Sequence, residues 1–180
     1  QIHKNGDGYY HDPAGNNYQK VLPDKLQPHN IEAEEAVIGS LLIDTDAIMR
    51  VSATLEPVDF YIDRHGWIYD AIRHLYARNR PADLVLICDE LTQRGQLKEA
   101  GGPAELTRLI NATPTSIHVE YYAGIVRRCA FNRWLIAGAG DIARLAYGDG
   151  DDQDDIAGQA EEIIFSVTAR QRESGLRPIM

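Results

Sequence analysis

The stretch IHVEYYAGIVRRCAFNRWLIAGAGDIARLAY, residues 117–147, decides the architecture that this sequence predicts. It contains no proline. It follows Thr113-Pro114-Thr115-Ser116, where proline interrupts the chain and a serine can cap a new helix. We therefore predict one long helix, or two nearly collinear ones, over 117–147. At a rise of 1.5 Å per residue its length would be about 45 Å.

A second helical pattern follows after an acidic turn that runs from Gly148 to Asp155. We expect a helix over about 156–172, with one face formed by Ile156, Ala160, Ile163, Ile164 and Val167. Two long helices joined by a short polar turn make an antiparallel hairpin. Such a hairpin has more apolar surface than a small head can cover. We favour the interpretation that a second copy of the chain or another protein covers this apolar surface. The alternative is that the head itself packs onto the hairpin.

The sequence before the hairpin predicts several shorter helices. Asn30 is a suitable N-cap for the first of them, whose first turn carries Glu32 and Glu34. Asp44 or Thr45 can cap a second short helix that continues to Leu55. Further helices are expected over 64–78, 84–94 and 103–111. Residues 84–88 also fit a strand, but the apolar spacing and the following Gly95 favour a helix capped by Asp83.

Composition limits the classes of function. The net charge of −9 argues against a domain whose main task is to grip a phosphate backbone. Cys88 and Cys129 lie in apolar runs, where buried reduced thiols are the usual state. No apolar run approaches the roughly 20 residues of a membrane span, and no signal peptide is visible. We expect a cytoplasmic protein with no membrane contact.

Catalytic and cofactor motifs are absent or misleading. There is no Gly-Lys pair for a Walker loop. Residues 138–143 have the glycine spacing of a dinucleotide fingerprint, but a helix rather than a strand precedes them. Counted from Asp149, the sixth and twelfth positions of a calcium loop hold Asp154 and Ala160 instead of Gly and Glu. We interpret this segment as a solvated turn, with Asp154 or Asp155 capping the last helix.

No histidine or cysteine has the spacing of a zinc motif. We therefore predict no catalytic, cofactor-binding or metal-binding residue in this chain. A small enzyme would need carboxylates such as Asp59, Asp63 and Glu90 to converge in one pocket, and surface charge is the simpler interpretation. A grip on single-stranded DNA by Arg127, Arg128 and Arg133 would be weak at most, and its signature would be a steep dependence on salt.

The segment LQPHNIEAEEAVIGSLL, residues 26–42, resembles the opening of the N-terminal domain of the replicative DNA helicase, the DnaB family. Further stretches resemble that domain in the same order, and together they cover about 22–173. They are Asp59-Phe60-Tyr61, Ile68-Tyr69-Asp70-Ala71-Ile72, Pro81-Ala82-Asp83-Leu84-Val85, Gly101-Gly102, Thr113-Pro114-Thr115, Tyr122-Ala123-Gly124-Ile125-Val126, Arg133-Trp134-Leu135-Ile136 and Ala160-Glu161-Glu162-Ile163-Ile164-Phe165.

The resemblance implies an all-α fold, a small globular helical head followed by a long antiparallel helical hairpin. It implies the head over 23–112, the hairpin over 113–173, and over 174–180 the start of a linker to an absent ATPase domain. Residues 1–22 are rich in Gly, Asn, Asp, His and Tyr and show no periodicity, so we expect them to form a flexible tail. In the family such domains pair through their hairpins and form a collar on the hexameric ring. Six residues of the first hairpin helix are the predicted interface: Tyr121, Tyr122, Ile125, Val126, Arg133 and Trp134.

The partners implied by the resemblance are other copies of the chain, the C-terminal domain of primase and the helicase loader. ATP and magnesium would belong to the absent motor domain, so this part of the chain is expected not to be an enzyme by itself. The alternative is a freestanding helical adaptor that recruits primase or loader.

Overall fold

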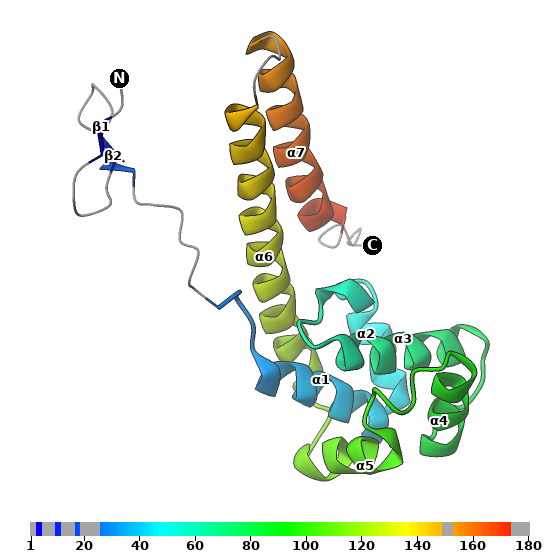
Figure 1. Cartoon of the computed structure of the whole chain (residues 1–180). Helices are drawn as coiled ribbons and strands as arrows, with labels where there is room; N and C mark the ends of the chain where they lie inside the picture. Colours follow the sequence, from blue (N-terminus) through cyan, green and yellow to red (C-terminus); the bar gives the residue numbers. More distant parts are fainter. Residues whose placement is uncertain (1–2, 5–9, 12–16, 19–25, 149–152, 174–180) are drawn as a thin grey trace, which may run out of the picture.

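The computed structural model describes residues 3–4, 10–11, 17–18, 26–148 and 153–173. Seven α-helices and two short 3-10 helices make up the body of this described part (Figure 1). The α-helices are α1 (Ile31–Ile43), α2 (Ile48–Val51), α3 (Asp63–Ala77), α4 (Leu84–Gln93), α5 (Gly102–Ala112), α6 (Val119–Tyr147) and α7 (Gln153–Glu173). The 3-10 helices are η1 (Thr45–Ala47) and η2 (Pro57–Asp59). The predicted all-α head and hairpin are confirmed.

Local sequence signals explain where several helices begin and end. The side chain of Asn30 accepts a hydrogen bond from the Ala33 amide at 2.9 Å and thereby caps α1. Asp83 accepts one from the Leu86 amide at 2.8 Å and caps α4, as predicted. Gly101, just before α5, has a φ of 90°, a conformation that favours glycine.

The core of the head lies among α1 to α5 and the first turns of α6. Its largest fully buried side chains come from every one of the head's longer helices: Ile38 and Leu41, Ile68, Tyr69, Ile72 and Leu75, Ile87 and Leu91, Leu106 and Leu109. Tyr69 is buried with its hydroxyl donating to the Leu55 carbonyl at 3.0 Å, so its polar atom is satisfied.

The hairpin consists of α6 and α7, and Figure 1 shows it rising from one side of the head with the two helices antiparallel. Helix α6 is a single unbroken helix of 29 residues, which settles the choice between one helix and two. At Gly138 the helices pack closely, because a Cβ there would lie 3.3 Å from both Ile163 and Val167. Gly138 therefore serves helix packing, as expected, whereas Ala139 and Gly140 are exposed and a Cβ on Gly140 would meet nothing within 4 Å.

Three sequence predictions differ from the structure. The expected second helix from Asp44 to Leu55 is divided into η1 and α2, and neither has a side-chain cap. Asp154 and Asp155 lie inside the first turn of α7 instead of capping it, because α7 begins at Gln153. Cys88 and Cys129 are both free, but each is half-buried, not buried.

The described part of the predicted tail holds three strands, β1 (His3–Lys4), β2 (Tyr10–His11) and β3 (Asn17–Tyr18). They pair antiparallel in the order β1-β2-β3. No periodicity in the sequence indicated them. The rest of the predicted tail, the predicted linker over 174–180 and the acidic residues at 149–152 lie outside the described residues.

Candidate protein-interaction surface

Helix α6 belongs to two parts of the molecule. Its N-terminal half packs into the head through Val119, Ala123 and Val126, which are 0–1% exposed. Val126 was predicted as an interface residue, but the core of its own head surrounds it. Tyr122 and Ile125 are half-buried against the same core. Among these first-half residues of the predicted set, Tyr121 alone points outward, with 70% of its surface exposed.

A buried ion pair fastens α6 to the head. The Asp59 carboxylate at the end of η2 is fully buried, and both of its oxygens lie 3.1 Å from Nη1 of Arg127. The Glu56 amide donates to the same carboxylate at 2.8 Å. Burial raises the pKa of Asp59 above its ordinary value, while the Glu56 amide and the Arg127 guanidinium oppose that rise. The two partners are 68 residues apart in the sequence.

Arg133 and Trp134 form the shoulder where the hairpin leaves the head. Arg133 donates to the carbonyls of Pro28 at 2.8 Å and Asp59 at 2.6 Å. The Trp134 ring lies close to two guanidinium groups, with its centroid 4.6 Å from that of Arg127 and 5.3 Å from that of Arg170. Beside them is a groove of about 390 Å³, lined by Ala53, Thr54, Glu56, Val58, Arg127, Trp134 and Arg170.

These contacts affect whether Arg127, Arg128 and Arg133 are available to bind single-stranded DNA. Arg127 is committed to Asp59, and it also donates to the Arg170 carbonyl. Arg133 is committed to two backbone carbonyls. Of the three arginines considered for this role, Arg128 is the exposed one. Arg127 and Arg133 are therefore engaged in contacts within the chain.

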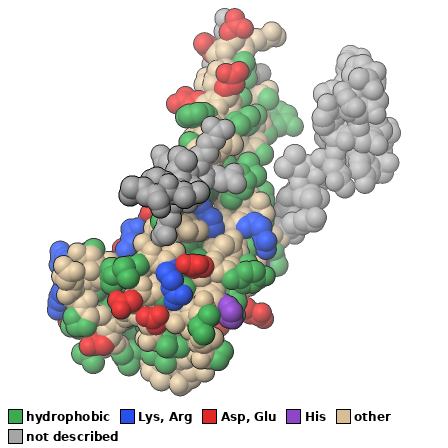
Figure 2. Space-filling model, turned by 180° about the vertical axis from the view of Figure 1, so that it is seen from behind, with side chains coloured by type: hydrophobic (Ala, Val, Ile, Leu, Met, Phe, Trp, Pro, Cys, Tyr) green, Lys and Arg blue, Asp and Glu red, His purple; other side chains and the backbone are tan. Residues whose placement is uncertain are grey.

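The far part of the hairpin exposes large apolar side chains. We call them the distal apolar set: Leu135 (43% exposed), Ile136 (51%), Tyr147 (87%), Ile164 (54%) and Phe165 (67%). Hydrophobic side chains along the hairpin are also visible in Figure 2. From the sequence, Ile164 was assigned to the apolar face of the last helix, and the other four residues were not predicted as interface residues. The available signal was that these large apolar residues lie off the face that packs the two helices together.

The carboxylates considered for a small enzyme do not form a common site. Asp59 pairs with Arg127, whereas Glu90 on α4 contacts Arg94 at 2.7 Å and His74 at 2.8 Å. Asp63 is exposed at the start of α3. The three carboxylates therefore do not converge in one pocket. Within the described part of the chain, no helix is both long enough and apolar enough to cross a membrane.

Comparisons with known proteins agree with this architecture. Residues 26–128 match the family described as the DnaB-like helicase N terminal domain. The replicative DNA helicase DnaC of Bacillus subtilis is 39% identical over 159 residues, which are 88% of this chain and 35% of that protein. The replicative helicase DnaB of Leifsonia xyli is 34% identical over 87% of this chain and 34% of its own length. The chain thus spans about a third of the length of these relatives.

Two solved structures show the same fold. The N-terminal domain of DnaB helicase from Mycobacterium tuberculosis matches with a TM-score of 0.75 and 36% identity, over 79% of this chain and 99% of that one. The N-terminal domain of the Helicobacter pylori helicase, described with its interactions with primase, matches with a TM-score of 0.58 and 24% identity. That second match covers 65% of this chain and 91% of the other.

Proposed function

The chain belongs to the family of DnaB-like helicase N-terminal domains, and from this we propose that it is the assembly and docking domain of a replicative DNA helicase. In this proposal it contributes to the N-terminal collar of a hexameric ring in the cytoplasm and binds primase during DNA replication. ATP-dependent unwinding, with its nucleotide and magnesium, belongs to a motor region outside this domain. The helicase loader is a further partner in the proposal.

The observation that carries the proposal is the distal apolar set. Five large apolar side chains at 43–87% exposure lie on a hairpin that projects from the head. Exposed apolar residues gathered on one element are typical of a protein interface. Covering them with a second hairpin would complete the packing that α6 and α7 begin at Gly138.

The six residues predicted from the sequence take different parts in this proposal. Tyr121 is exposed at the base of the hairpin and Trp134 is half-buried at its shoulder, so both are open to a partner. Val126 and Arg133 support the interface indirectly, because one anchors α6 in the core and the other ties it to the Pro28 and Asp59 carbonyls.

Light scattering of the purified chain tests the assembly part of the proposal. We expect a mass above that of one chain, rising with concentration. The double variant Ile164→Ser/Phe165→Ser should weaken association at least tenfold, because each change removes apolar surface that a partner would bury. Val85→Ser is the matched control, since Val85 is 74% exposed on α4 of the head.

Addition of the C-terminal domain of a matching primase tests the docking part. We expect a stable gain in mass that is retained by Val85→Ser. A chain that stays monomeric at every concentration and gains no mass with primase would contradict the proposed function.

A further inference from the structure

A buried histidine of the head is oriented by a buried carboxylate. Nδ1 of His65 on α3 lies 2.9 Å from Oε2 of Glu34 on α1, and the two side chains are 0% and 1% exposed. Glu34 cannot turn away easily, because it also accepts hydrogen bonds from the amides of Tyr61 at 2.7 Å and Ile62 at 3.2 Å. This arrangement places a hydrogen on Nδ1 and leaves Nε2 as the second functional atom of the ring.

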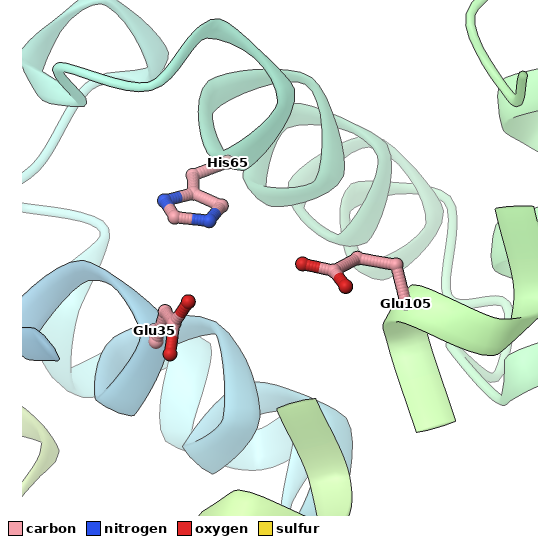
Figure 3. A group of neighbouring side chains, drawn as sticks. All are labelled: Glu35, His65 and Glu105. Carbon is pink, nitrogen blue, oxygen red and sulfur yellow. The ribbon is translucent and has the colours of Figure 1, made fainter. Parts of the chain in front are cut away.

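Nε2 of His65 is buried and has no hydrogen-bond partner among the described residues. Two further carboxylates, of Glu35 on α1 and Glu105 on α5, approach this histidine. One ligand atom from each of His65, Glu35 and Glu105 lies within 4.8 Å of the other two. Figure 3 shows the three side chains facing a common space from three different helices. A buried nitrogen without a partner is rare and calls for an explanation, and a bound ion is one that suits a position next to two carboxylates.

We propose that Glu35, His65 and Glu105 form a binding site for a divalent first-row metal ion, for which Zn²⁺ is the probe. A carboxylate that accepts the Nδ1 hydrogen of an imidazole fixes its orientation and raises its basicity as a metal ligand at Nε2. One imidazole and two carboxylates supply the nitrogen and oxygen donors that zinc accepts, with solvent completing the coordination. The bound ion would tie together α1, α3 and α5.

The negative charge of the site is balanced by two arginines, Arg108 and Arg64, the second of which lies 3.7 Å from Glu105. Arg108 donates to Glu105 at 2.8 Å and to Glu35 at 2.6 Å. Its side chain is 45% exposed, so it can swing into solvent and leave both carboxylates to a metal ion. Arg108 therefore competes with the metal for the same two ligands.

The distances require a small closure. A tetrahedral zinc ion with bonds of about 2.0–2.2 Å holds its ligand atoms about 3.3–3.6 Å apart, so atoms that lie up to 4.8 Å apart would approach by up to about 1.5 Å. The glutamate side chains can make this movement, because Glu35 and Glu105 are only partly buried, at 26% and 14% exposure. No motif in the sequence indicated this site, because its three ligands come from separate helices and match no spacing along the chain.

Isothermal titration of the whole chain with Zn²⁺ tests the proposal. The background carries His3→Ala and His11→Ala, because β1 and β2 pair these two histidines of the predicted tail and imidazole is a common ligand of zinc. We expect saturable binding with a stoichiometry of one and a rise in melting temperature. Glu105→Gln should weaken binding at least tenfold. Arg108→Gln should strengthen it, which is the opposite of what removal of a merely stabilising ion pair would do.

His74→Gln is the matched control, since His74 also contacts a glutamate, Glu90 at 2.8 Å, but lies outside the cluster. It should leave the zinc affinity unchanged. If circular dichroism shows that Glu105→Gln does not fold, Glu35→Gln replaces it. Absence of saturable binding, equal affinity in the glutamate variants and the parent, or an NMR spectrum in which Nε2 of His65 keeps a proton in the presence of zinc would each overturn the proposal.

Discussion

Three carboxylates in the head, Glu34, Asp59 and Glu90, are buried, and each has a specific set of partners. Glu34 is held by two backbone amides and His65. Asp59 is held by Arg127 and the Glu56 amide, and Glu90 by Arg94 and His74. A buried charge that loses its partner is strongly destabilising, so these residues fix how the elements of the head are arranged.

Replacement of Arg127 by Met should lower the free energy of unfolding by about 3 kcal/mol or more at neutral pH, because it leaves Asp59 charged and unpaired in the core. Without Arg127 the pKa of Asp59, already raised by burial, rises further. A carboxyl group with a raised pKa destabilises the folded state only at pH values at which the group is ionised. The loss should therefore be largest at about pH 7 and shrink towards about pH 4.5, as Asp59 takes up a proton.

Urea unfolding of the parent and the variant at both pH values measures this effect. Arg127 also contacts Trp134 and the Arg170 carbonyl, and the loss of those contacts does not depend on the ionisation of Asp59. A destabilisation that is the same at both pH values would show that those contacts, and not the buried carboxylate, account for the effect.

At the scale of elements, the packing of α1 against the end of α5 depends on one glycine. A Cβ on Gly39 would lie 1.9 Å from Oγ1 of Thr113 and 2.7 Å from the Leu109 carbonyl. The backbone of α5 and the side chain of Thr113, which follows α5, both come this close, so no larger residue fits without moving the helix.

Gly39→Ala should therefore destabilise the chain by about 1–3 kcal/mol, in spite of the better helix propensity of alanine. Gly124→Ala is the matched change in α6, where a new Cβ would meet nothing within 4 Å. That variant should gain up to about 1 kcal/mol. Thermal or urea unfolding of both variants provides the measurement, and equal effects of the same sign would contradict this account of the α1–α5 contact.

The elements could be predicted well where the signal is local. The caps at Asn30 and Asp83 and the apolar spacing of α3 act within a turn or two of the chain, so they can be seen in the sequence. Glu34 shows the limit. Its place in the first turn of a helix indicated only a charge that the helix N-terminus favours, but tertiary contacts with Tyr61, Ile62 and His65 bury it.

For the molecule as a whole, the head does not end where the sequence suggested. The predicted boundary at 112–113 separates the head from the hairpin, but Val119, Ala123 and Val126 of α6 belong to the head's core. The same fact explains why the predicted interface mixed outward and inward residues. A helix that serves two units has two apolar faces, and periodicity alone does not tell which of them is turned towards solvent.

Truncation of the chain tests this account of the head. A chain that stops at residue 118 should lose cooperative unfolding, because three core residues and the Arg127 partner of Asp59 are missing. A chain that stops at 148 keeps all of these and should unfold cooperatively without α7. Circular dichroism during urea titration distinguishes the two, and a cooperative transition of the shorter chain would show that the core does not need α6.

The continuity of α6 has a mechanical consequence. One end of this helix is clamped in the core by Val119, Ala123 and Val126, and its other end, from Leu135 to Tyr147, extends about 20 Å beyond the shoulder. Tyr147 lies about 30 Å beyond Arg127, so a rotation of the head by about 10° about the Asp59–Arg127 pair would move the tip sideways by about 5 Å, because the helix has no break that could absorb the movement. A force that a bound protein applies to the tip of the hairpin would therefore be transmitted along α6 to the Asp59–Arg127 pair at the base of the helix.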